Sequence, residues 1–216
     1  LFATGSMILV FILFQFLKLP VISVKKTAFH FKGLIDKDAL PASAVMLVFL
    51  FTFGALENFM ALFASERNLP GGGIFFTIMA GMLFVTRATV GKVADQKGEG
   101  IFVYTCNASM FAAFMLMAFV PDTITFLIAA VLAGYGFGGL EPALQSMAVH
   151  IAPLQRRGSA NSTFLCAYDI GIGLGGGVAG ILISGAGFKW MFAILSLANV
   201  ISVSLYLLWG QHHPSS

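Results

Sequence analysis

Three carboxylate side chains lie inside long apolar segments of the sequence: Glu57, Glu141 and Asp169. An ionisable residue near the middle of a membrane helix costs roughly 2.5–3.5 kcal/mol on insertion scales, so each of the three is a candidate functional residue. A medium of low dielectric disfavours the ionised form of a carboxyl group. Such a group can therefore exchange a proton for a cationic or polar molecule near neutral pH.

Each carboxylate also has a purely structural interpretation. Glu57 can be a polar residue that faces a water-filled cavity, and Asp169 can make a hydrogen bond to a neighbouring helix. Glu141 precedes Pro142, which leaves a backbone carbonyl one turn earlier without its helical partner, so Glu141 also marks a kink. No basic residue is expected in the middle of a span, so we predict no buried cationic partner for these carboxylates within this chain.

The composition places these residues in a membrane protein. Hydrophobic residues make up 58 % of the 216 residues and charged residues only 10 %, whereas a soluble domain has roughly 25 % charged residues. The apolar runs are long and do not alternate with polar residues, which predicts helices rather than a β-barrel. The fold class is therefore all-α, a polytopic helix bundle in a lipid bilayer, and the net charge of +3 gives no reason to expect a nucleic-acid partner.

Seven segments are long and apolar enough to span a membrane. They are Leu1–Leu17, Pro41–Ala64, Gly72–Thr89, Ile101–Val120, Thr123–Ile151, Ala160–Ser184 and Phe188–Trp209. Residues 18–40 form the longest link between spans, and a short tail, residues 210–216, follows the last one. The chain opens at Leu1 inside an apolar run and without an initiating Met, so we expect that its beginning is missing.

Lysine and arginine are distributed unequally over the two sides of such a bundle. With alternating links, ten of the twelve fall on one side, and only Arg67 and Lys189 fall on the other. The positive-inside rule then assigns the basic side, together with the tail 210–216, to the cytoplasm of a cell whose plasma membrane holds the chain.

The densest run of charge and glycine is the predicted turn Arg87–Gly100 between two spans. Its carboxylate, Asp95, has cationic neighbours in Arg87, Lys92 and Lys97, and can make charge-assisted hydrogen bonds to them or cap a helix. Glycines such as Gly91 and Gly98 allow a tight turn. The run is either a cytoplasmic latch, formed in one conformation and broken in another, or a solvated hairpin turn.

The segment from Gly91 to Gly98 resembles the Gly-x-x-x-Asp-x-x-Gly signature of the major facilitator superfamily, which lies between the second and third helices of each six-helix half. Two further stretches add to this resemblance: the glycine-rich run Gly134–Gln145, and Arg156–Ala160 followed by Asp169–Gly173. The last of these resembles a helix of bacterial drug:proton antiporters. Gln96 and Glu99 depart from the basic residues usual in the signature.

The resemblance implies a domain organisation and a function. Residues 1–17 would be the last helix of a truncated N-terminal half, 18–40 the central cytoplasmic loop, and 41–209 a C-terminal six-helix half. The expected function is proton-coupled efflux of small organic molecules by alternating access, with protons, substrate and the missing N-terminal half as partners. Uptake of sugars or other polar metabolites, and a non-transporting fragment, remain alternatives. Mid-span histidines and His/Cys clusters are absent from the sequence, so we expect no enzyme, no metal site and no cofactor.

Small residues spaced four apart predict close helix packing. The pairs are Gly134 with Gly138, and Gly173 with Gly177.

Overall fold

The computed structural model describes residues 35–209, together with residues 5, 7, 11 and 14. The chain divides into two compact units, Leu1–Phe31 and Lys32–Ser216, and the helices discussed below all belong to the second. Most of the predicted span Leu1–Leu17, most of the loop 18–40 and the whole tail 210–216 lie outside the described residues.

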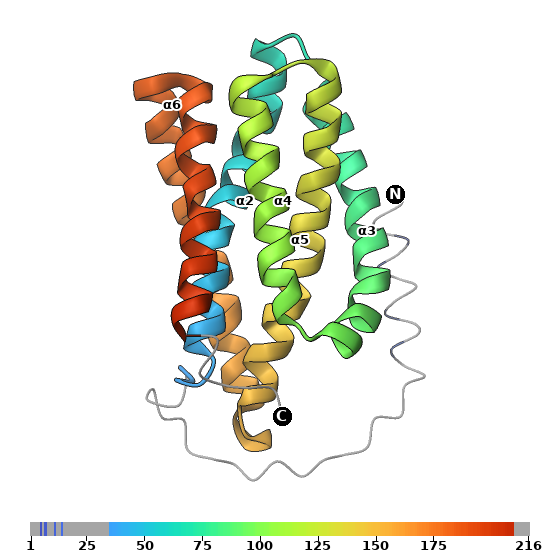
Figure 1. The fold of residues 1–216 in the computed structure, drawn as a ribbon, viewed down its shortest axis with the longest axis vertical. Helices are drawn as coiled ribbons and strands as arrows, with labels where there is room; N and C mark the ends of the chain where they lie inside the picture. The colour runs from blue at the N-terminus through green and yellow to red at the C-terminus, as the bar shows by residue number, and fades with distance from the viewer. Residues whose placement is uncertain (1–4, 6, 8–10, 12–13, 15–34, 210–216) are drawn as a thin grey trace. The chain divides into compact units, whose positions relative to one another are not determined.

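The second unit is a bundle of long helices (Figure 1). The elements are α2 (Leu40–Glu66), α3 (Gly72–Lys97), α4 (Gly100–Phe119), α5 (Thr123–Ile151), the short 3₁₀ helix η2 (Leu154–Arg156) and α6 (Arg157–Trp209). Each of α2 to α6 contains a segment long and apolar enough to cross a membrane. The described part of the chain contains no strand, in agreement with the predicted all-α membrane bundle.

Six predicted spans correspond to these five helices, because α6 consists of two helical segments joined at a kink. Gly187 interrupts it with a φ of 76° and a ψ of 175°, a conformation that side-chain-bearing residues rarely adopt. The two segments on either side of Gly187 match the predicted spans Ala160–Ser184 and Phe188–Trp209. A count of seven spans is not confirmed, because the first predicted span lies mostly outside the described residues.

The predicted turn Arg87–Gly100 is wrong in its extent. Helix α3 continues to Lys97, and only Gly98 and Glu99 separate it from α4. The helix continues because Val90, Val93 and Ala94 keep an apolar face packed on the core, while the single Gly91 costs only about 1 kcal/mol in a helix. Gly98 ends the helix with a φ of 79° and its N–H bonded to the Ala94 carbonyl.

Other helix boundaries follow from local chemistry. Asp122 caps α5: its Oδ1 accepts the Thr125 N–H at 2.8 Å, and its own N–H donates to Thr125 Oγ1 at 3.2 Å. This reciprocal arrangement satisfies amide groups that the first turn of a helix leaves free. Helix α2 has a proline, Pro41, in its first turn, where no helical hydrogen bond is lost.

Helices α2 and α6 approach each other closely at glycines. A Cβ added to Gly175 would lie 2.5 Å from the Cα of Phe51, and one added to Gly171 would lie 2.6 Å from the Leu47 carbonyl oxygen. Backbone atoms cannot move away as a flexible side chain can, so these positions need glycine. The largest fully buried side chains around this contact and its neighbours are mostly aromatic: Phe49, Phe63, Phe75, Phe114, Phe126, Phe164 and Phe192.

Candidate functional site

The site is built on an ion pair between α3 and α5. A guanidinium nitrogen of Arg87, Nη2, donates to Glu141 Oε2. Arg87 lies inside the segment of α3 that is apolar enough to span a membrane, about 15 Å along the helix from Lys97 at 1.5 Å per residue. We predicted no buried cationic partner for Glu141, and Arg87 is a partner whose side chain is 46 % exposed. The pair was not foreseen, because α3 is longer than its apolar run and carries Arg87 as a helical residue.

Two glycines of α5 set the register of this pair. A Cβ on Gly138 would lie 3.0 Å from Leu83 Cα, and one on Gly134 would lie 2.9 Å from Met82 Cβ. The residue numbers of the contact partners increase together along both helices, so α3 and α5 run in the same direction. One turn beyond the contact between Leu83 and Gly138, the next pair on this face is Arg87 and Glu141. The close packing at Gly134 and Gly138 thus places the guanidinium beside the carboxylate.

Tyr168 on α6 brings the remaining predicted carboxylates into the same neighbourhood. Tyr168 lies within electrostatic range of Glu141, Glu57, Arg87 and Asp169. We call these five residues the charged cluster. The cluster contains one side chain from each of α2, α3 and α5, and two consecutive residues from α6.

Aromatic rings adjoin the charged cluster. The ring of Phe137 lies 6.3 Å from that of Tyr168, and Phe53 stacks on Phe137 with 4.0 Å between ring centroids and 9° between the planes. Stacked rings give a flat apolar surface, and such a surface next to a few polar groups is typical of small-molecule sites.

The members of the cluster differ in how their charges are compensated. The side chains of Arg87 and Glu141 are 46 % and 21 % exposed, so their pair is only partly shielded. Glu57 and Asp169 are exposed and have no ion pair within the part of the chain that the structure describes. The cluster thus contains three carboxylates and one guanidinium, and the guanidinium pairs with Glu141.

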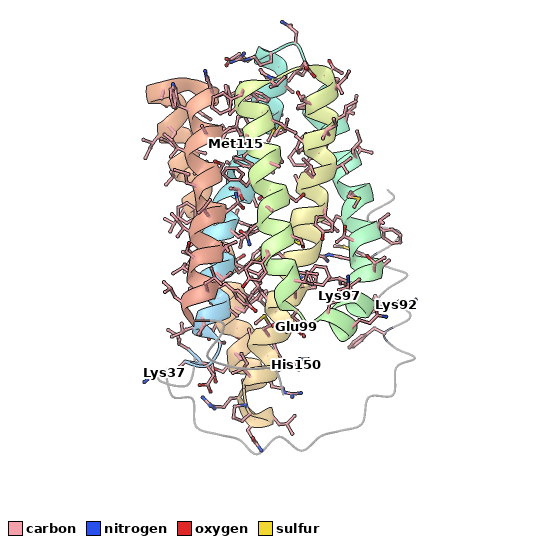
Figure 2. The ribbon with its side chains drawn as sticks, in the orientation of Figure 1. Lys37, Lys92, Lys97, Glu99, Met115 and His150 are labelled. Atoms are coloured by element: carbon pink, nitrogen blue, oxygen red, sulfur yellow. The ribbon has the colours of Figure 1, made fainter. Side chains whose placement is uncertain are left out.

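The described residues of the predicted latch lie along the last turns of α3 and at its end. Figure 2 shows Lys92 and Lys97 near the end of α3, at the same end of the bundle as Lys37 and His150. Lys92 and Lys97 are exposed, and neither pairs with a described acid. Gly91 faces open space, Gly98 ends the helix, and Arg87 lies higher in α3. The side chain of Asp95 lies outside the described part, so the latch stays a prediction.

The second predicted glycine pair does not make the packing contact. No described atom lies within 4 Å of a Cβ built on Gly173 or Gly177, whereas Gly171 and Gly175 meet the backbone of α2. The close face of α6 is therefore two residues out of phase with the predicted one. Gly173 and Gly177 lie on the exposed face, which also carries Asp169 one turn earlier.

Sequence reasoning missed an ion-pair network at the end of the bundle where α2 begins. Arg156 in η2 contacts Asp36 Oδ2 at 3.0 Å through Nη1 and Asp38 Oδ2 at 2.7 Å through Nη2. The Asp36 side chain is 1 % exposed, and its backbone N–H donates to Thr163 Oγ1 at 2.9 Å. The sequence does contain a basic pair after Pro153 and two acidic residues before α2. These two groups are far apart in the sequence, so nothing in the sequence predicted an ion pair between them.

Tyr168 and Phe53 were also missed. Aromatic residues are common in membrane helices, so their type carries no site signal until the fold places them beside the charged cluster. As for metal binding, no group of three or more His, Cys, Asp or Glu side chains that could hold an ion occurs among the described residues.

Comparison with known proteins agrees with this architecture. Residues 45–216 match the family model described as the Major Facilitator Superfamily. The chain is 28 % identical over 204 residues to the staphylopine export protein of Staphylococcus aureus (strain Mu50 / ATCC 700699), an alignment that covers 92 % of this chain and 51 % of that protein. It is 26 % identical over 157 residues to YhhS of Escherichia coli (strain K12), described as an uncharacterised MFS-type transporter, covering 73 % of this chain and 38 % of YhhS.

The chain thus spans about half the length, or less, of these curated relatives. The matched region includes all the helices of the second unit except the start of α2, and with them the charged cluster. On these grounds the chain belongs to the major facilitator superfamily.

Proposed function

We propose that this chain takes part in the export of small cationic organic molecules across a membrane in exchange for protons. The observation that carries the proposal is the charged cluster, in which three carboxylates and one guanidinium lie within electrostatic range of Tyr168 on membrane-length helices. The similarity to a protein named for staphylopine export supports export as the direction of transport.

The charge of the cluster supports proton exchange. With all groups ionised, Arg87 compensates one carboxylate through its pair with Glu141, and Glu57 and Asp169 leave two negative charges without a described partner. Uncompensated charge in a medium of low dielectric is costly. Two protons, or one proton and a monovalent cation, remove that cost, so a cation and a proton compete for the same carboxylates.

The aromatic rings supply the other half of a binding site for such a molecule. Phe53 and Phe137 offer an apolar stacked surface, and the face of an aromatic ring also attracts cations. An organic cation can place its charge near Glu57 or Asp169 and its apolar part on these rings.

The ion pair of Arg87 with Glu141 can couple protonation to helix movement. A proton on Glu141 removes the countercharge of Arg87 and weakens the link between α3 and α5. Alternating access rocks one helix bundle against another around a fixed site, and we propose that loosening this link lets α3 follow that motion. A second six-helix bundle, supplied by a partner segment or chain, would close the pathway on the exposed face of α3 and of the first segment of α6.

The test is transport in vesicles that contain the complete transporter, with a fluorescent lipophilic cation as the probe. An imposed pH gradient should drive cation movement against the proton flow, and Glu57→Gln or Asp169→Asn should reduce it at least tenfold. Glu66→Gln, an exposed acid at the end of α2, is the matched control and should leave it unchanged. Cation movement in the same direction as the protons would instead support uptake, and movement unaffected by either variant would refute the carboxylate proposal.

We also propose an orientation in a plasma (inner) membrane, with the end that carries Lys37, Lys92 and Lys97 in the cytoplasm (Figure 2). The excess of Lys and Arg at this end supports it. Cysteine placed at Asn68, between α2 and α3, should react only with reagent added outside the cell, and cysteine at Lys92 only with reagent inside. The reverse pattern would overturn the orientation.

A further inference from the structure

A second site lies on a different face of the bundle, between α4 and the last segment of α6. These two helices run antiparallel and meet at two levels. At one level a Cβ on Gly100 would touch the Tyr206 hydroxyl, and Tyr104 packs edge-on against Tyr206 with ring centroids 5.8 Å apart. At the other level the rings of Phe114 and Phe192 meet edge-on at 5.3 Å.

Two asparagines lie halfway between these contacts. Asn107 is seven residues from Gly100 and seven from Phe114, and Asn199 is seven residues from Tyr206 and seven from Phe192. Because the helices are antiparallel, the two asparagines are at the same level, about 10 Å from each contact at 1.5 Å per residue. This level is in the interior third of α4, which is about 30 Å long, and therefore within the hydrocarbon of a bilayer.

The helices do not fill the space between them at this level. A hollow of about 350 Å³ opens there, lined by both asparagines, by Tyr104 and Ser204, and otherwise by apolar side chains. The Ser204 hydroxyl donates to the Val200 carbonyl of its own helix at 2.8 Å. Its volume is at the lower end of the range for small-molecule sites. The exposed residues at its edge include Tyr104 and Val200, which are 41 % and 50 % exposed.

Both asparagines are 1 % exposed, and each has one hydrogen-bonding atom without a partner. The Asn107 side-chain amide donates to the Val103 carbonyl at 2.7 Å, and that of Asn199 donates to the Ser196 carbonyl at 3.1 Å. These donations fix the orientation of each amide group, since a flipped group would set two oxygens against each other. The two Oδ1 atoms are left buried with no donor.

We propose that the hollow binds a neutral lipid with a free hydroxyl group, whose O–H donates to Asn107 or Asn199 while its chain fills the apolar space. Carbonyl oxygens accept only, so the occupant must bring a donor. The lining contains no charged side chain, so a charged occupant would be buried without compensation. The bilayer supplies such amphiphiles, and a hydrogen bond to Asn107 or Asn199 would offset the cost of bringing the hydroxyl group from the interface to this depth.

A helix of another chain fits the hollow less well. Close helix association in membranes relies on small residues that let backbones approach. Here the exposed side chains of Tyr104 and Val200 stand at the edge of the hollow and would hold a helix away from the asparagines, whereas a flexible chain can enter between them.

The test uses a long-chain alcohol with a photoreactive diazirine near its hydroxyl, and the methyl ether of the same molecule, which cannot donate. Each probe is incorporated into vesicles that contain the full chain, irradiated, and located by mass spectrometry of peptides from α4 and α6. One interhelical hydrogen bond in a membrane changes an equilibrium roughly three- to eighteenfold. We expect the alcohol to label these peptides more than the ether by a factor in that range.

Variants separate this site from non-specific lipid contact. Asn107→Leu and Asn199→Leu should each lower the ratio of alcohol to ether labelling, and the double variant should bring it to one. Thr77→Val removes an exposed hydroxyl of α3 that bonds only within its own helix, and should leave the ratio unchanged. Ala108→Leu keeps both asparagines but narrows the hollow from its exposed edge, and should reduce labelling by both probes.

Equal labelling of the wild-type chain by alcohol and ether would overturn the proposal. So would a ratio that survives the double Asn variant, because the donor would then bond elsewhere. If a protein helix occupied the hollow, neither probe would label α4 and α6 above the level of the remaining helices, and the proposal would fail in that case too.

Discussion

The contact between α2 and the first segment of α6 predicts different stabilities for two glycine substitutions only two residues apart. A Cβ at Gly175 would lie 2.5 Å from both the Cα and the carbonyl oxygen of Phe51. These are backbone atoms of a packed helix, so Gly175→Ala must push the helices apart, and overpacking of this kind costs about 1–3 kcal/mol.

Gly173→Ala meets nothing within 4 Å in the described chain. Replacing a helical glycine by alanine at an open position stabilises a helix by about 0.8–1 kcal/mol. Gly175→Ala gains the same helix propensity, so the free energies of unfolding of the two variants should differ by the overpacking cost alone, about 1–3 kcal/mol, with Gly173→Ala the more stable.

The assay is equilibrium unfolding of the chain in mixed detergent micelles, followed by the loss of helical circular dichroism. Comparing two alanines on one helix removes differences in side-chain chemistry, so the difference in unfolding free energy reports only what each new methyl group meets. If Gly173→Ala destabilised the chain as much as Gly175→Ala, the face of α6 assigned to α2 would be wrong.

Two further predictions concern the ends of the helices. Arg156→Gln removes the cationic partner of Asp36, whose side chain is 1 % exposed. The Asp36 Oδ2 atom accepts no hydrogen bond within the described residues, so the loss is that of a counter-charge to a buried carboxylate, about 1–3 kcal/mol or more. The same unfolding assay should show this loss, while Lys92→Gln, at an exposed residue, should show none. The hydrogen bond from the Thr125 backbone N–H lowers the pKa of Asp122. The stabilisation from this cap is therefore fully present above the ordinary aspartate pKa of about 3.9 and is lost as pH falls through the lower folded-state pKa. Amide exchange in the first turn of α5 should rise in that acid range, and the same pH profile in Asp122→Ala would contradict this prediction.

The helices themselves were predictable because each carries a long apolar run. The interruption at Gly187 was predictable as well, since the short link Gly185–Gly187 separates two such runs. The end of α3 was not, because hydropathy detects where apolar residues stop and not where helical hydrogen bonds stop. Residues 87–97 are helical although they include several charged and polar side chains. For this reason Arg87 was assigned to a turn rather than to a pair with Glu141.

The packing face of α6 shows a different limit. Glycines at 171, 173, 175, 176, 177 and 180 create four-residue spacings on several faces of one helix. Spacing alone cannot choose between Gly171 with Gly175 and Gly173 with Gly177, since only the position of α2 distinguishes them.

The candidate site was predictable in part. The cost of burying a carboxylate identified Glu57, Glu141 and Asp169 from their residue type and location in apolar segments. That argument concerns one residue at a time, so it could not show that Tyr168 lies among them or that Arg87 compensates only one of the three charges. Likewise, the pairing of Arg156 with Asp36 depends on two segments more than 100 residues apart.

The central claim is that a cation and protons compete for the carboxylates of the charged cluster. Its most direct test counts the protons released when a monovalent lipophilic cation binds, by calorimetry in buffers of different ionisation enthalpy. If the cation takes the place of one proton at Glu57 or Asp169, as we propose, binding should release about one proton per cation. Glu57→Gln or Asp169→Asn should lower this number, and Glu66→Gln should not. Cation binding without proton release, or the same release in all three variants, would contradict the account.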